Sequence, residues 1–317
     1  MRVNRAAKPG KIRGPEMSCN LRVRWIAAIT LTLAGIAQAQ TQPQPQAQTK
    51  NGVAFWEVDP QPVDALLQAA PRSDALRYQT LHSGFQKFQC TPELMEEQPA
   101  GKSGEKNLVC TLRGKTADRI LVVARYDGRQ GKSRPTWPDA MILMLLYHAL
   151  QAQPREHTFV FAEIASRDGE KVFFDAERKR PQPAVTIVLD SLGMREPRLL
   201  MPPPPKHGEM AAEIQETQTV LQDQNLKTRA LMGIPPRPPM RIVSKDEGEF
   251  MAAWYQALTE SSLLWAAQRT PAALIYSDAT MDLNVPPSAF HQDFDFLGWF
   301  LGGIDLKLAA KAETPSH

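Results

Sequence analysis

The sequence has few of the residues that build metal centres and covalent active sites. Its six histidines and three cysteines are scattered, and it contains neither an H-E-x-x-H motif nor a Cys/His cluster with zinc-ligand spacing. No G-x-S-x-G stretch surrounds a serine, which argues against a serine hydrolase. Any metal or catalytic site in this chain must therefore be assembled from residues that lie far apart in the sequence.

An excess of positive charge is missing as well, once the N-terminal region is set aside. The formal net charge is +3, but residues 1–39 contain seven Lys/Arg and one acidic residue. The remaining residues contain 30 basic and 33 acidic side chains, a net charge of −3. No basic run or aromatic-basic stripe is present, so the sequence predicts no nucleic-acid partner.

Long hydrophobic runs are absent apart from one near the N-terminus. That run, "WIAAITLTLAGIA" at residues 25–37, follows two arginines and ends in the pattern "AQA". It is shorter than the roughly 20 residues of a membrane span, and its flanks are typical of a cleaved signal peptide over residues 1–39. Met17 is an alternative start, and an uncleaved anchor is the competing interpretation. The prediction is a periplasmic or secreted protein with no membrane span after cleavage.

Cysteine usage agrees with an oxidising compartment. Cys19 lies in the predicted signal peptide, which leaves Cys90 and Cys110 as an even pair. We expect these two residues to form a disulfide. The competing zinc-site interpretation lacks a nearby histidine to complete a closed site.

Composition divides the rest of the chain into three parts. Residues 40–60 begin with the Gln/Pro-rich stretch "QTQPQPQAQTKNG" and are expected to be a disordered linker. Residues 61–308 are expected to form one domain, and residues 309–317 a disordered tail. No internal repeat is present.

Hydrophobic periodicity predicts an alternation of strands and helices in this domain. Strands are expected at 107–112, 120–124, 157–165, 184–193 and 272–276, and helices at 64–81, 140–152, 209–232, 247–267 and 290–304. A turn at residues 113–115 joins the first two strands, and proline-rich loops bracket the helix at 209–232. This order predicts an α/β fold whose mostly parallel sheet carries helices on both faces.

Polar residues follow three of the predicted strands. Arg125 and Asp127 follow the first, Ser166-Arg167-Asp168 the second and Asp190-Ser191 the third. The carboxyl ends of parallel strands meet at one edge of a sheet, where ligands bind, so these side chains are expected to converge. The competing interpretation is that each only caps a loop or the next helix.

Five stretches, in order and at matching spacing, resemble metallopeptidase family 28. They are "NLVCTLRG…RILVVARYDG", "TWPDAMILMLLYHAL", "HTFVFAEIASRDGEKVFF", "TIVLDSLG" and "DLNVPPSAFHQDFDFLGWFLGGID". The whole resemblance runs from about Leu81 to Leu306. This family includes zinc aminopeptidases, glutaminyl cyclases and relatives without metal. The resemblance implies a zinc-exopeptidase-like three-layer sandwich with a mixed sheet of roughly eight strands.

The resemblance also implies a dinuclear zinc site, most of whose ligands are missing here. Active members use two histidines and three carboxylates, with a separate glutamate as general base. Residues at the corresponding positions are Arg125, the second-shell Asp127, Pro135 for the bridging carboxylate, Arg167 for the general base, Asp168, Asp190, and Tyr276 or Ser277 for the last histidine. Arginine stays protonated, so it neither ligates a metal nor accepts a proton as a base.

Two positions in this correspondence stay open. A local gap offers Asp139 instead of Pro135 as the bridging residue, and another register places Glu163 and Ile164 at the paired glutamates. In the preferred register, Arg125 and Arg167 stand where two zinc ions would lie. We therefore expect these guanidinium groups to neutralise Asp127, Asp168 and Asp190.

These considerations favour a secreted peptidase-like protein with a degenerate zinc site. The expected role is non-catalytic binding of a peptide, a small ligand or a protein partner, with no cofactor. The alternative is a metal-dependent aminopeptidase-type or glutaminyl-cyclase-like hydrolase with one zinc on Asp168, Asp190 and an unidentified third ligand. A third interpretation is a diverged relative that retains no ligand.

Overall fold

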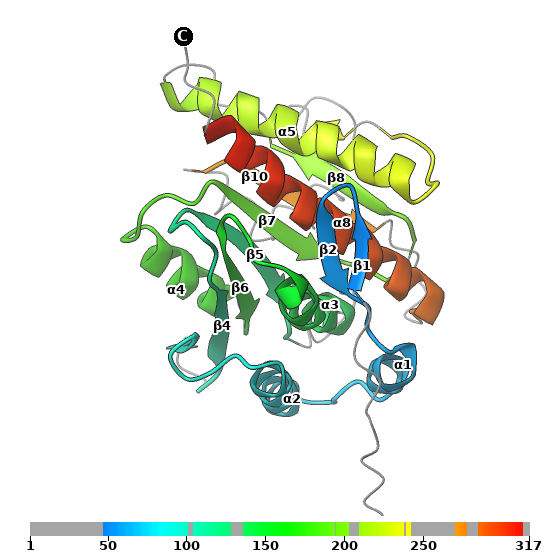
Figure 1. Ribbon diagram of the computed structural model, residues 1–317. Coiled ribbons are helices and arrows are strands. Elements are labelled where there is room, and N and C mark those ends of the chain that lie inside the picture. The colour runs from blue at the N-terminus through cyan, green and yellow to red at the C-terminus, as the bar shows by residue number, and fades with distance from the viewer. Residues whose placement is uncertain are drawn as a thin grey trace, which may run out of the picture. The chain divides into compact units, whose positions relative to one another are not determined.

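A mixed eight-stranded sheet forms the centre of the computed structural model (Figure 1), in the order β3-β4-β6-β5-β7-β10-β8-β9. The predicted α/β class and the expected strand number are confirmed. The structure describes residues 47–100, 104–127, 136–193, 195–202, 209–237, 239–241, 270–277 and 285–312. The predicted signal peptide and the helix expected at 247–267 lie outside these residues.

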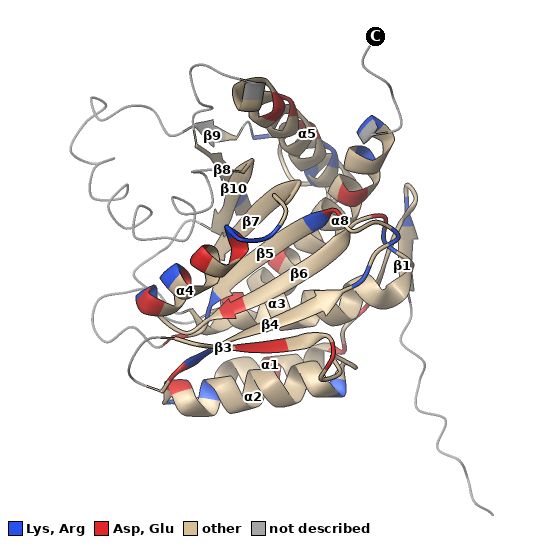
Figure 2. Cartoon of the chain, turned by 90° about the vertical axis from the view of Figure 1, so that its left-hand side faces the viewer, with Lys and Arg blue, Asp and Glu red and all other residues tan. Residues whose placement is uncertain are grey.

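Four parallel strands occupy the middle of the sheet. They are β6 (Thr158–Ile164), β5 (Arg119–Arg125), β7 (Val185–Asp190) and β10 (Ala272–Ser277). Because both faces of these strands are buried, their sequences are almost continuously apolar. Figure 2 shows β5, β6 and β7 nearly free of charged residues. The parallel arrangement places the carboxyl ends of all four strands at one edge.

Shorter strands complete both sides of the sheet. On one side β4 (Lys106–Leu112) is antiparallel to β6 and β3 (Met95–Pro99) is antiparallel to β4. On the other side β8 (Pro197–Met201) is antiparallel to β10, and β9 (Met240–Arg241) is parallel to β8. The turn predicted at residues 113–115 does not join neighbouring strands, because β6 lies between β4 and β5.

Helices cover both faces of the sheet. Ile120 and Val122 of β5 share one core cluster with α3 (Trp137–Ala149) and α8 (Pro287–Ala312). The alternate residues Leu121 and Val123 pack with Phe173 and Phe174 of α4 (Arg167–Glu177) on the opposite face. The 3₁₀ helix η1 (Leu150–Ala152) follows α3, and α5 (Glu209–Leu231) packs against α8. Three layers result, as expected.

Two helices replace the single helix expected over residues 64–81. They are α1 (Pro60–Gln68) and α2 (Asp74–Lys87), each with its own N-cap. The Asp59 side chain accepts a hydrogen bond from the backbone N–H of Gln61, and Ser73 accepts one from Leu76. The break between the helices contains Pro71, which lacks the N–H that a continuous helix needs.

The expected linker is ordered where it is described, which corrects the boundary at residue 60. Strands β1 (Ala47–Lys50) and β2 (Val53–Trp56) form an antiparallel hairpin. Its two-residue turn has φ 53° at Asn51 and φ 78° at Gly52. Asn-Gly is the preferred pair for such positive φ values in a tight hairpin. The Asn-Gly pair is visible in the sequence, at the end of the Gln/Pro-rich stretch.

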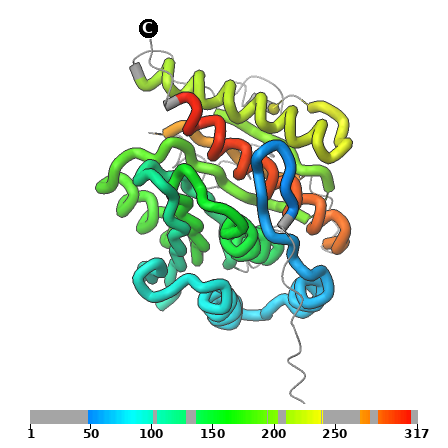
Figure 3. The backbone as a smooth tube through the Cα atoms, viewed as in Figure 1, coloured from blue at the N-terminus to red at the C-terminus, as the bar shows by residue number. Residues whose placement is uncertain are grey.

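The hairpin lies across α8, a helix more than 230 residues further along the sequence (Figure 3). Phe55 is fully buried, and its ring meets Trp299 edge-on at a centroid distance of 4.8 Å. Buried Arg155 fixes the other side of the hairpin, because it donates to the backbone carbonyls of Ala54 and Leu150. The hairpin is therefore part of the domain.

The end of the chain also differs from expectation. Helix α8 continues through Ala312, so residues 309–312 belong to a helix and not to a disordered tail. Lys311 anchors this last turn through an ion pair with Glu216 of α5, at 2.9 Å. No helix among the described residues combines the length and the apolar character needed to cross a bilayer.

The expected disulfide is present and connects Cys90, just after α2, with Cys110 of β4. It closes a loop with a sequence separation of 20 residues, in a fully buried position. A cross-link of this span restricts the unfolded chain and contributes about 2–4 kcal/mol.

We predict that dithiothreitol lowers the free energy of unfolding of the protein by this amount, measured by guanidinium denaturation. The control is the Cys90→Ala/Cys110→Ala variant, which should start at the lower stability and not respond to the reductant. An equal response of both proteins would contradict the prediction.

Candidate functional site

Arg125 ends β5 at the carboxyl edge of the sheet and is held by two carboxylates. Its Nε and Nη2 atoms donate to the two oxygens of Asp127, at 2.9 and 2.6 Å. Its Nη1 atom donates to Glu170 Oε1 at 3.3 Å, and the Arg125 side chain is only 12% exposed. This bidentate pair with a third contact confirms that Asp127 is neutralised by Arg125.

The charge of Arg125 is permanent in this setting. Burial acts to lower the pKa of Arg125, but the hydrogen bond and charge of Asp127 and the charges of Glu170 and Asp190 outweigh it, so the pKa is raised. All three donor nitrogens are engaged by carboxylates, as described above. The group therefore serves as a fixed cation that neutralises acidic side chains.

Glu170 was missed by sequence reasoning, and the geometry of α4 explains its position. It is 1% exposed, and its face of α4 also carries Phe173, Phe174 and Glu177, all of which are buried. The spacing i, i+3, i+4, i+7 is that of a helix face turned to the core, and it was available in the sequence.

A close contact fixes the start of α4 against β4. The Asn107 side chain donates to the Gly169 carbonyl at 2.8 Å and accepts from the Ala165 N–H at 3.1 Å. A Cβ atom at Gly169 would lie 2.3 Å from Asn107 Oδ1, so only glycine permits this approach. The contact holds Glu170 within reach of Arg125.

Arg167 and Asp168 do not occupy the expected positions in the cluster. Both are exposed residues in the first turn of α4, and neither forms a hydrogen bond or ion pair with another described residue. The expectation that Arg167 neutralises the strand-end carboxylates is therefore wrong. Glu170, one helical turn into α4, faces the sheet in their place.

The other register, with Glu163 and Ile164, places both residues inside β6. Glu163 is fully buried, and neither of its carboxylate oxygens has a hydrogen-bond partner among the described residues. Burial raises the pKa of Glu163 well above its usual value, and the charge of Asp139 raises it further. Burial without a partner disfavours the ionised form of this carboxyl.

Asp139 lies in the first turn of α3, where it binds the loop after β7. Its two oxygens accept the backbone N–H groups of Ser191 at 2.9 Å and Leu192 at 2.7 Å. Burial and the nearby charge of Asp190 raise the pKa of Asp139 well above its usual value, against the effect of these hydrogen bonds. Its hydrogen bonds fix Ser191, whose φ of 61° is left-handed.

Asp190 and Ser277 end the two remaining central strands. The Ser191 hydroxyl lies 3.0 Å from Asp190 Oδ1, and the Ser277 hydroxyl donates to the Ser191 carbonyl at 2.6 Å. The Gly193 N–H donates to Asp293 of α8, at 2.6 Å. The sheet edge thus brings together Arg125, Asp127, Asp190 and Ser277. Pro135, the preferred bridging position, lies outside the described residues.

The described part of this edge does not provide a zinc ligand set. Among the residues that the structure describes, no three His, Cys, Asp or Glu side chains are grouped so as to hold a metal ion. The protonated Arg125 guanidinium has no lone pair to give a metal. Both carboxylate oxygens of Asp139 already accept hydrogen bonds from backbone N–H groups. Zinc prefers imidazole or thiolate together with carboxylate, and this edge offers mainly paired or buried carboxyls.

Comparison with solved structures identifies the fold. The glutaminyl cyclase of Macrostomum lignano matches with a TM-score of 0.55 and 13% identity, over 80% of this chain and 90% of that one. A Zn-dependent exopeptidase from Parabacteroides distasonis matches with a TM-score of 0.51 and 10% identity, over 77% and 95%. The fold is that of zinc exopeptidases and glutaminyl cyclases.

These likenesses extend to the fold alone, given the low identities. The aminopeptidase from Aneurinibacillus sp. strain AM-1 has a TM-score of 0.43 and 14% identity, and the match covers 63% of this chain and 47% of that one. No protein-family model matches the sequence, and no curated protein is significantly similar to it. In this chain, the carboxyl edge of the sheet carries the group formed by Arg125, Asp127 and Glu170, here called the Arg125 cluster.

Proposed function

We propose that this chain is a secreted or periplasmic peptidase-like protein whose dinuclear zinc site is degenerate and whose role is non-catalytic binding. The observation that carries the proposal is the position of Arg125, whose guanidinium neutralises Asp127 and Glu170 at the carboxyl edge of the sheet. That edge is where ligands bind in folds with parallel strands. A fixed cation in this place orders the edge and cannot ligate a metal for hydrolysis.

The proposed ligand is a peptide, a small molecule or a protein surface that contacts this edge. Arg167 and Asp168 are exposed beside the cluster and have no partner among the described residues. They therefore offer one cation and one anion to a ligand. The end of a peptide, or a protein surface that carries charges of both signs, matches this pair. Arg125 itself is engaged by carboxylates, so it orders the edge and does not bind the ligand.

The alternative function is a hydrolase of the aminopeptidase or glutaminyl-cyclase type with a mononuclear metal site. It is supported by the fold of the solved neighbours, whose names record zinc-dependent exopeptidase and glutaminyl cyclase activities. Asp168 and Asp190 would have to supply its ligands. An all-oxygen pair of this kind suits zinc poorly.

Zinc binding separates the two functions. We predict that mature protein, residues 40–317, retains less than about a tenth of an equivalent of zinc after incubation with excess metal and desalting, because Arg125 and Arg167 cannot ligate it. Elemental analysis measures the content, and thermal denaturation with and without EDTA should show no shift. One or two retained equivalents of zinc, with a lower melting temperature in EDTA, would support the hydrolase function over the binding role.

A further inference from the structure

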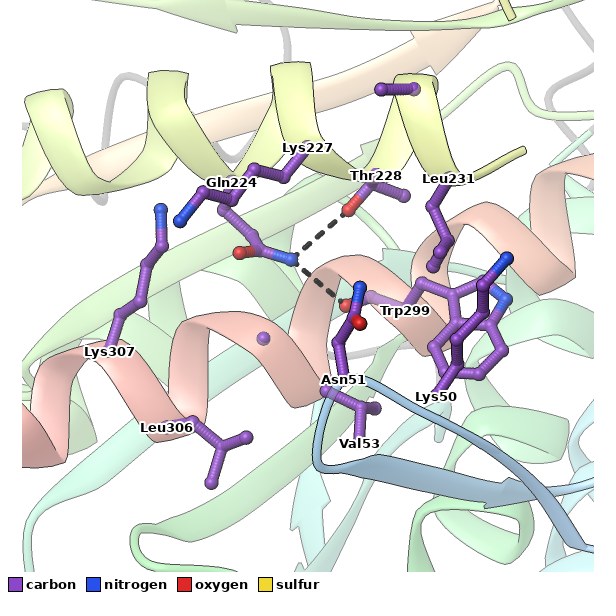
Figure 4. A pocket seen from close by; sticks show the side chains of 12 residues that line it. Lys50, Asn51, Val53, Gln224, Lys227, Thr228, Leu231, Trp299, Leu306 and Lys307 are labelled. Atoms are coloured by element: carbon purple, nitrogen blue, oxygen red, sulfur yellow. Dashed lines mark hydrogen bonds between the residues drawn. The ribbon is translucent and has the colours of Figure 1, made fainter. Parts of the chain in front are cut away.

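A cavity lies away from the Arg125 cluster, between the β1–β2 hairpin, α5 and α8 (Figure 4). Its volume is about 650 Å³, which is within the range of sites for small molecules. The proposed function makes no use of this cavity.

The cavity adjoins the amino ends of the parallel strands. Leu306 and Lys307 line it, and their neighbour Asp305 accepts the backbone N–H groups of Glu156 and His157, just before β6. The hairpin turn is likewise tied to this end, because the Gln153 side chain donates to the Gly52 carbonyl at 3.1 Å. Arg125 lies at the opposite ends of the same strands, so the two sites are separate.

Three lysines line the cavity and give it a positive character. They are Lys50 of the hairpin, Lys227 of α5 and Lys307 of α8, and none of them forms an ion pair with a described carboxylate. Figure 4 shows Lys227 and Lys307 together at one end of the cavity. One turn further along α8, Lys311 does pair with a carboxylate, Glu216 of α5. The lysines of the cavity thus lack the partner that this neighbouring lysine has.

The electrostatic setting of Lys307 shows that positive charge is in excess here. Burial lowers the pKa of Lys307, and the charge of Lys227 and a side-chain contact with it lower the pKa further. The charge of Asp223 acts in the opposite direction but does not reverse the shift. Like charges this close repel each other, and an anion bound between them would relieve the repulsion.

Apolar side chains and neutral polar groups form the rest of the lining. Trp299, Leu231 and Leu306 contribute apolar surface, and Figure 4 shows Trp299 at the end away from Lys227 and Lys307. The Gln224 amide is fixed by Thr228 at 3.2 Å and by the Trp299 carbonyl at 3.3 Å. The end at Lys227 and Lys307 therefore favours negative charge, and the other end, where Figure 4 shows Lys50 beside Trp299, offers an aromatic surface next to a third lysine.

We propose that this cavity binds a small amphipathic anion. Its carboxylate, phosphate or sulfonate lies between Lys227 and Lys307, and its aromatic or aliphatic body lies against Trp299 and Leu231. Charge-assisted hydrogen bonds from two ammonium groups fix the anionic end, and burial of apolar surface stabilises the other. This site is independent of the carboxyl edge, and its existence does not depend on whether that edge binds a ligand or a metal.

The probe for this site is 8-anilinonaphthalene-1-sulfonate, which carries one sulfonate and an aromatic body. We expect saturable one-to-one binding by isothermal titration calorimetry, weakened at least tenfold in Lys227→Gln/Lys307→Gln. The matched control is Lys311→Gln, which removes a positive charge from the same helix outside the cavity and should leave the affinity unchanged. Thermal denaturation of each variant verifies that the fold is intact.

A second arm separates the anionic contact from general hydrophobic binding. The neutral probe N-phenyl-1-naphthylamine lacks the sulfonate, so its affinity should not differ between the wild type and the double variant. The proposal is overturned if the double variant binds the sulfonate as tightly as the wild type, or if Lys311→Gln weakens binding equally.

Discussion

Arg125→Ala is expected to lower the free energy of unfolding by about 3–5 kcal/mol at neutral pH. The substitution leaves the carboxylates of Asp127 and Glu170 in a largely buried place without the cation that neutralises them. Breaking a buried ion pair from one side has this cost because the remaining charge is desolvated and uncompensated. Guanidinium denaturation of the mature protein at neutral pH measures the change.

An exposed ion pair on α4 gives the matched control. Arg178 and Asp175 are 2.7 Å apart, and their side chains are 32% and 44% exposed. Arg178→Ala should therefore cost no more than about 1 kcal/mol. Adding Asp127→Asn and Glu170→Gln to Arg125→Ala should restore stability, since both uncompensated charges are removed. Equal effects of Arg125→Ala and Arg178→Ala would show that the cluster does not stabilise the fold.

Glu163→Gln is expected to change how stability depends on pH. The raised pKa of Glu163 means that the folded state holds its proton at pH values where the unfolded chain, with an ordinary value of 4.5, has lost it. Its contribution is therefore fully present below the unfolded pKa and is lost as pH rises towards the folded pKa. The loss approaches about 1.4 kcal/mol per pH unit for one proton.

The variant and the wild type should thus be similar in stability near pH 4 and diverge above it. Glutamine keeps the shape of the neutral acid without titrating, so Glu163→Gln should become progressively more stable than the wild type from pH 5 to pH 8. Asp139 and Asp293 also have a raised pKa, mainly through burial, so part of the slope remains. The control is Glu213→Gln on the exposed side of α5. Parallel pH profiles for Glu163→Gln and the wild type would refute the prediction.

The centre of the fold was predictable because its signals are local. The apolar runs of β5, β6 and β7 and the largely apolar stretch of α3 each determine their own secondary structure. The outer strands β3 and β8 were missed, because "MEEQP" and "PRLLM" become strands only through pairing with β4 and β10. Pairing between distant segments is not encoded in either segment alone.

In the candidate site, too, local features were predictable from the sequence and long-range contacts were not. Arg125 and Asp127 are two residues apart and were recognised together, and the structure confirms their pairing. Arg167 and Asp168 are exposed and do not join Arg125, because the start of a helix can face solvent as easily as the sheet. Which residue of α4 turns inward depends on Asn107 and Gly169, whose contact joins segments 62 residues apart. This contact forms only when the chain folds, so the sequence of α4 alone does not show which of its residues turns inward.

The hairpin on α8 has a consequence for the order in which this protein folds. Phe55 completes its aromatic contacts only with Phe294 and Trp299, so this part of the core cannot close until α8 has been synthesised. Contacts of such long sequence separation slow folding and leave apolar surface uncovered in the interim. While the chain is growing, residues 47–56 therefore remain an undocked segment with apolar side chains that chaperones can bind.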